Sequence, residues 1–84
     1  MHLTHYTDYA LRTLIFLAAK GSPSTIAEVA ARFRISRNHL VKVVHSLGKT
    51  GLIKTERGKL GGIRLAMPAD QIMVGDVVRK MKVN

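Results

Sequence analysis

Apolar residues in the first quarter of the chain lie on almost every side of a predicted helix. The segment TDYALRTLIFLAAK (7–20) begins with Thr7, a residue type suited to the N-cap, and is followed by Gly21, which favours a helix end. The pattern predicts a helix from about Thr7 to Lys20. Its apolar surface exceeds what one small core requires, so we expect it to contact a second subunit or a segment outside this chain.

Two shorter periodic segments follow, separated by three residues. Thr25 and Glu28 fit a capping box, and apolar residues then recur at helical spacing to Phe33. Ser36 can cap a third helix that ends at Thr50–Gly51. The core face of this third helix is predicted to hold Leu40, Val43, Val44 and Leu47. The opposite face holds Arg37, Asn38, Val41, Lys42, His45 and Lys49. A three-residue connection between two helices is typical of a helix-turn-helix.

The second half of the chain alternates as strands do. Residues 52–57 and 63–66 predict two paired strands, and the glycines between them permit positive φ and close approach of backbone to a phosphate. These glycines are Gly58, Gly61 and Gly62. A turn at 68–71 and a last helix from near Val74 complete the chain. The predicted fold is mainly α with a small β-hairpin, a single winged helix-turn-helix domain over residues 1–84.

Charge indicates the class of partner. The 84 residues carry a formal net charge of +9 with a pI near 10.7. Between residues 32 and 64 there are nine lysines and arginines against one acid, a net +8. Such a concentration favours a polyanion, either nucleic acid or an anionic membrane surface. The membrane alternative is weaker because the bases do not line one face of a single long amphipathic helix.

Several other classes are disfavoured. The chain has no cysteine, so neither disulfides nor a thiolate metal site can form within it. His2, His5 and Asp8 fall three apart, but we assign no metal site to them. There are no paired carboxylates on one predicted face, no nucleophile beside a histidine and no P-loop, which argues against an enzyme. No signal peptide and no apolar run near the ~18 residues of a membrane span are present, which predicts a cytoplasmic protein.

The start of the third helix holds the sharpest candidates for DNA contact. Arg37 can donate a bidentate pair to guanine, and Asn38 can pair with adenine in the same way. Ser36 can cap the helix and also reach a phosphate. The alternative is a capped helix start that only faces solvent.

The remaining candidates are predicted to hold the DNA backbone. Lys42 and Lys49 lie on the same face as Arg37 and suit phosphates better than bases. In the hairpin, phosphate or minor-groove contacts are expected from Arg57, Lys59 and Arg64, unless this is an ordinary glycine-rich hairpin. The two histidines of the third helix, His39 and His45, either touch DNA or are merely exposed.

Four blocks of the sequence, in order, resemble the iron–sulfur-dependent winged-helix repressors of the IscR and NsrR type. They are LTHYTDYALR (3–12), SRNHLVKV (36–43), RGKLGGIRL (57–65) and VGDVVR (74–79). The likeness covers the whole chain and is strongest to the nitric-oxide-sensing NsrR branch. It implies a homodimeric repressor of nitric-oxide or iron–sulfur stress genes that binds a palindromic operator in double-stranded DNA.

The resemblance also implies parts that this chain lacks. Longer relatives continue with a three-cysteine loop that binds an iron–sulfur cluster, and then with a dimerisation helix. We therefore expect the chain to stop before both and to hold no cofactor itself. Asp8 lies in a block that resembles the family's. The resemblance suggests that its carboxylate acts as a cluster ligand in a full-length form. The alternative is that Asp8 only stabilises the N-terminus of its helix. A different function remains open, a winged-helix module that binds protein or RNA without operator specificity.

Overall fold

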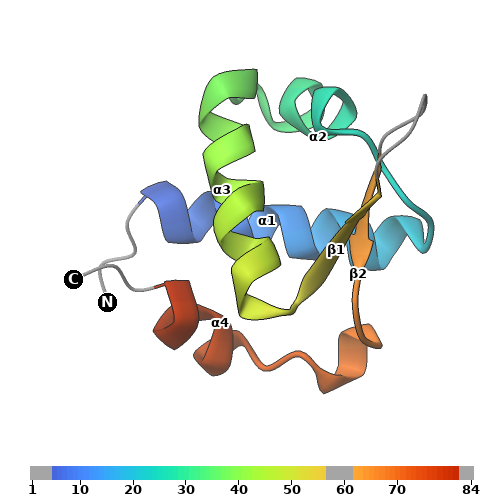
Figure 1. Ribbon diagram of the computed structural model, residues 1–84, viewed down its shortest axis with the longest axis vertical. Helices are drawn as coiled ribbons and strands as arrows, with labels where there is room; N and C mark the ends of the chain where they lie inside the picture. Colours follow the sequence, from blue (N-terminus) through green and yellow to red (C-terminus); the bar gives the residue numbers. More distant parts are fainter. Residues whose placement is uncertain (1–4, 57–61, 82–84) are drawn as a thin grey trace.

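The computed structural model describes residues 5–56 and 62–81 and has the predicted winged-helix architecture. Three helices come first, then a two-stranded antiparallel hairpin, a 3-10 turn and a last helix (Figure 1). In order, these elements are α1 (His5–Lys20), α2 (Ile26–Phe33), α3 (Arg37–Thr50), β1 (Ile53–Glu56), β2 (Gly62–Leu65), η1 (Ala69–Gln71) and α4 (Val74–Met81).

The first helix begins earlier than predicted. It starts at His5, and Thr7 is buried inside its first turns, so the expectation that Thr7 caps the helix is wrong. The preceding turn is helical because the aromatic rings of Tyr6 and Tyr9 pack against α3. The predicted end is correct: Gly21 has a φ of 69°, and its N–H donates to the Leu17 carbonyl at 3.0 Å.

The helix-turn-helix follows its local sequence signals closely. The Thr25 hydroxyl accepts from the Glu28 N–H at 3.0 Å, and the Ser36 hydroxyl accepts from the His39 N–H at 3.1 Å. Between the helices, Arg34 adopts the left-handed conformation with a φ of 56°, and Ile35 turns into the core. Both caps and the three-residue turn are therefore confirmed.

The hairpin is supported by a residue outside it. Strands β1 and β2 pair from Ile53–Leu65 to Glu56–Gly62. Ser24, in the loop between α1 and α2, adds a short antiparallel bridge to Ile63. Its N–H donates to the Ile63 carbonyl at 2.9 Å, and the Ile63 N–H donates back at 2.7 Å. The loop was predicted, but its pairing with the hairpin was not.

One core joins all the helices to the hairpin. Helix α3 crosses α1, and α4 lies beside both of them (Figure 1). The predicted core face of α3 is fully buried, as are Val29 of α2, Ile63 of β2 and Val77 of α4. Helix α1 buries one side only. Its other side carries Ile15, which is 67% exposed. In the described part of the chain, no helix is both long and apolar enough to cross a membrane.

Candidate nucleic-acid interface

The polar face of α3 is exposed along its whole length. It consists of Arg37, Asn38, Val41, Lys42, His45 and Lys49, all exposed, while the opposite side of the helix is buried. The helical repeat of 3.6 residues produces this division, since the apolar residues recur three and four apart. The structure thus brings five of the predicted contact residues onto one surface. Ser36 is exposed at the N-terminal end of the same helix.

His39 has a different environment from the rest. Its ring lies edge-on to Tyr9 at 5.1 Å between ring centroids and edge-on to Tyr6 at 6.3 Å. Both tyrosines belong to α1, so the imidazole packs against that helix. His45, by contrast, lines an open groove on the other side of α3.

The groove runs between α3 and β1 and has a volume of about 480 Å³. It is lined by Val44, His45, Gly48, Lys49, Ile53, Lys54 and Thr55. Lys49 from the helix and Lys54 from the strand place two cations in its walls. A groove between a helix and a hairpin with basic walls suits a strand of phosphate backbone.

Two residues near this surface were not among the predicted contacts. Lys54 is exposed in β1, next to the buried Ile53. Val41 is 48% exposed in the middle of the polar face, where an apolar side chain can contact a thymine methyl group. The sequence carried a signal for both, namely strand alternation for Lys54 and helical position for Val41.

The hairpin residues are only partly within the described structure. Arg57 and Lys59 lie outside it. The Arg64 guanidinium pairs with the Glu56 carboxylate, with 3.1 Å between Nε and Oε1, and both side chains are about half exposed. Such a pair is weak in water, so it leaves Arg64 able to turn to a stronger anion.

Gly62 does not have the role expected of it. It lies in β2 without a positive φ, and a Cβ at this position would come within 3.4 Å of the Pro23 Cβ. That distance is an ordinary van der Waals contact, so Gly62 lies where the hairpin packs beside the loop before α2, and its φ does not require a glycine. Gly58 and Gly61 lie outside the described residues.

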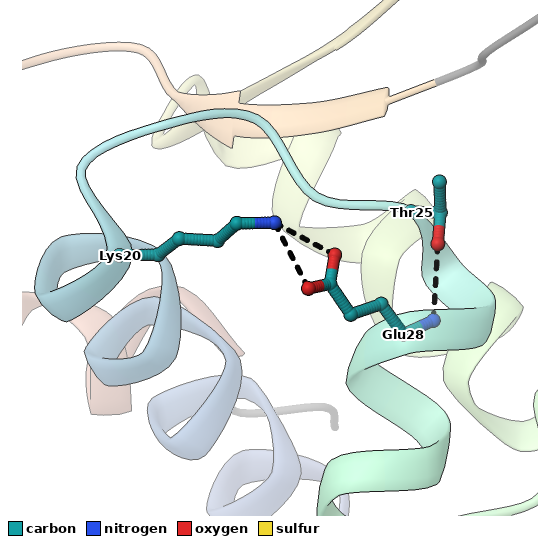
Figure 2. A network of polar contacts seen from close by, with 3 residues as sticks. All are labelled: Lys20, Thr25 and Glu28. Carbon is teal, nitrogen blue, oxygen red and sulfur yellow. Dashed lines mark hydrogen bonds and ion pairs between the residues drawn. The ribbon is translucent and has the colours of Figure 1, made fainter.

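A salt bridge fixes the loop that supports the hairpin. The Lys20 ammonium, at the end of α1, donates to both carboxylate oxygens of Glu28 at 2.7 and 2.9 Å (Figure 2). Glu28 belongs to the first turn of α2, so the bridge spans the loop that carries Ser24. The hydrogen bond from Lys20 is the main reason that the pKa of Glu28 is lowered.

Asp8 has a local partner. Its carboxylate accepts from Arg12 Nε at 3.1 Å, one turn along α1. Among the described residues, no group of three or more His, Asp or Glu side chains is placed to hold a metal ion, and the sequence has no cysteine. The donors in the described part of the chain therefore do not fit an iron–sulfur cluster. Asp8 as a cluster ligand in a full-length form stays a prediction.

Comparison with known proteins agrees with this geometry. A family model described as "Rrf2: Iron-dependent Transcriptional regulator" matches residues 3–83. The chain is 54% identical over 82 residues to the HTH-type transcriptional regulator NsrR of Bacillus subtilis (strain 168), an alignment that covers 95% of this chain and 56% of that protein. The chain thus spans little more than half the length of this relative.

Solved structures show the same fold. The cysteine regulator CymR of B. subtilis superposes with a TM-score of 0.91 at 30% identity, over 98% of this chain and 65% of that one. IscR of T. potens superposes with a TM-score of 0.88 at 28% identity, over 99% of this chain and 62% of that one. The predicted fold and the predicted relationship are both confirmed, and the chain belongs to the Rrf2 family of iron-dependent transcriptional regulators.

Proposed function

We propose that the chain is the DNA-binding part of a cytoplasmic repressor that binds a palindromic operator as a homodimer. In this proposal the polar face of α3 enters the major groove, with Arg37 and Asn38 reading bases. Lys49 and Lys54 hold phosphates on either side of the groove between α3 and β1, and Lys42 holds one elsewhere on the polar face. The observation that carries the proposal is the polar face itself, a row of exposed donors and cations on a helix whose other side is fully buried.

The regulated genes and the dimer rest on other observations. The assignment to nitric-oxide or iron–sulfur stress genes is supported by the 54% identity to a relative named NsrR. The homodimer is supported by the exposed apolar side of α1, where Ile15 is 67% exposed and Ala18 and Ala19 are also exposed. This chain has no cysteine that could ligate an iron–sulfur cluster.

The test is a selection of duplexes from a randomised pool, followed by titration at several salt concentrations. We expect a palindromic site with two half-sites about one helical turn apart, bound at least a hundredfold more tightly than a scrambled duplex. Affinity for both duplexes should fall with salt as phosphate contacts release counterions. Equal affinity for palindrome, scrambled duplex and single strand would instead favour a module that binds protein or RNA without operator specificity.

A further inference from the structure

The first turn of α1 is tied to the middle of α3 by one side chain. The Tyr6 hydroxyl donates to the Lys42 carbonyl oxygen at 2.5 Å, and it lies 2.8 Å from the Ser46 hydroxyl oxygen. These partners are 36 and 40 residues away along the chain. One turn further along α1, the Tyr9 ring rests against His39. The tyrosine rings therefore meet three successive turns on one side of α3.

The hydrogen bond to Lys42 is not required for α3 to be helical. Within an α-helix, the Lys42 carbonyl already accepts from the Ser46 N–H, so Tyr6 uses the second lone pair of that oxygen. Apolar packing holds α3 against α1, but such contacts tolerate small rotations and sliding. A directional bond to the backbone removes that freedom, because its strength falls steeply with distance and angle.

The point of attachment also matters. Lys42 belongs to the polar face, so the residue whose carbonyl is held from α1 also carries an exposed side chain of that face. Arg37 and Asn38 lie just over one turn earlier on the same rigid helix. Base readout needs donors held to within about 0.5 Å, so a constraint on the backbone of α3 acts on them directly.

We propose that Tyr6 is a positioning residue for base recognition, whose hydroxyl sets the rotation of α3 against α1 through Lys42 and Ser46. The proposal rests on the proposed function, in which the polar face of α3 reads DNA. It assigns to α1 a part in sequence discrimination, through a hydroxyl that holds the backbone of a residue in the polar face. Phosphate contacts are less demanding in geometry, so non-specific binding should not depend on this hydroxyl.

The test compares two matched variants, Tyr6→Phe and Tyr9→Phe. Each removes one hydroxyl from α1 and keeps the ring that packs on α3. The Tyr9 hydroxyl has no hydrogen-bond partner among residues 5–56 and 62–81, which makes Tyr9→Phe the control. Affinities for the selected palindrome and for a scrambled duplex are measured at a temperature where thermal unfolding curves show both variants to be folded.

We expect Tyr6→Phe to weaken binding to the palindrome about three- to tenfold, the equivalent of one ordinary hydrogen bond. Its affinity for the scrambled duplex and its salt slope should equal those of the wild type, since no charge changes. Tyr9→Phe should match the wild type on both duplexes. Ser46→Ala should weaken the palindrome less than Tyr6→Phe does, and the double variant should lose less than the sum of the two.

The outcomes separate this inference from the proposed function. If Tyr6→Phe lowers only the melting temperature and keeps the wild-type ratio of affinities, the hydroxyl is merely structural and the inference is overturned. Equal weakening on both duplexes overturns it as well. If the wild-type protein itself shows no preference for any duplex, the proposed function fails and the positioning role fails with it.

Discussion

Arg37 and Lys49 are both cations on the polar face of α3, but they differ in place and in chemistry. Arg37 is the first residue of the helix, where side chains point toward the base edges when a helix enters the major groove. Its planar guanidinium can donate two parallel bonds to guanine. Lys49 lies in the last turn, beside the groove that β1 completes, and its ammonium is a point charge suited to phosphate.

This difference predicts opposite signatures for two substitutions. Arg37→Ala should weaken binding to the selected palindrome by about 1–3 kcal/mol and relax the base preference at one position of each half-site. Lys49→Ala should weaken palindromic and scrambled duplexes alike and reduce the salt slope by about one unit. Both are measured by titration at several salt concentrations. Equal losses on the two duplexes for Arg37→Ala would remove it as a base reader.

At the scale of the element, α3 depends on its N-cap. The Ser36 hydroxyl satisfies the His39 N–H, one of the backbone donors that a helix start leaves free. The helix has no acidic residue in its first turn, so its positive N-terminal end is not neutralised from within. That end therefore attracts anions, which suits a phosphate.

Two substitutions at Ser36 should separate stability from binding. Ser36→Ala should lower the free energy of unfolding by about 0.5–2 kcal/mol, measured by urea denaturation. Ser36→Asp keeps a capping oxygen and should hold that free energy near the wild-type value, yet weaken every duplex because it places a negative charge beside phosphate. Thr25→Ala, the equivalent loss of a cap in α2, is the control for stability without DNA contact. A Ser36→Asp variant that binds as well as the wild type would contradict a phosphate at this position.

At the scale of the whole molecule, the loop between α1 and α2 joins the helices to the hairpin. Lys20 and Glu28 bridge its two ends, while Ser24 pairs with Ile63 of β2. Pro23 of the same loop lies next to Gly62 of β2. The position of the hairpin relative to α3 is thus set partly by residues that precede the helix-turn-helix.

The salt bridge makes stability depend on pH in a defined direction. Because the pKa of Glu28 is lowered in the folded protein, its contribution is present above the pKa of an unfolded-chain glutamate and is lost as pH falls through the folded value. The stability difference between the wild type and Glu28→Gln should therefore be largest above about pH 5 and disappear in more acidic solution. The effect should be small, since both side chains are partly exposed. Urea denaturation across this range measures it.

A matched acid provides the control for that experiment. Asp70 in η1 is exposed and forms no ion pair within the part of the chain that the structure describes. Asp70→Asn controls for the loss of an exposed carboxylate that breaks no ion pair. A pH-independent difference between the wild type and Glu28→Gln would mean that the bridge contributes nothing to folding.

The sequence by itself determined the elements whose signals are local. Caps at Thr25 and Ser36, the glycine stops and the 3.6-residue repeat all act within about four residues, so they located α2, the turn, α3 and its polar face correctly. The same reasoning misplaced the start of α1. Thr7 has the chemistry of a cap, but the rings beside it pack on α3, and that packing extends the helix to His5.

Tertiary structure alone decided the contacts between distant residues. Tyr6 meets Lys42 because α1 crosses α3, Ser24 reaches Ile63 because the loop folds back on the hairpin, and Lys54 faces Lys49 across a groove. None of these pairs has a sequence spacing that identifies it. They depend on how whole elements pack, and that is fixed by the burial of the shared core, not by any residue's immediate neighbours.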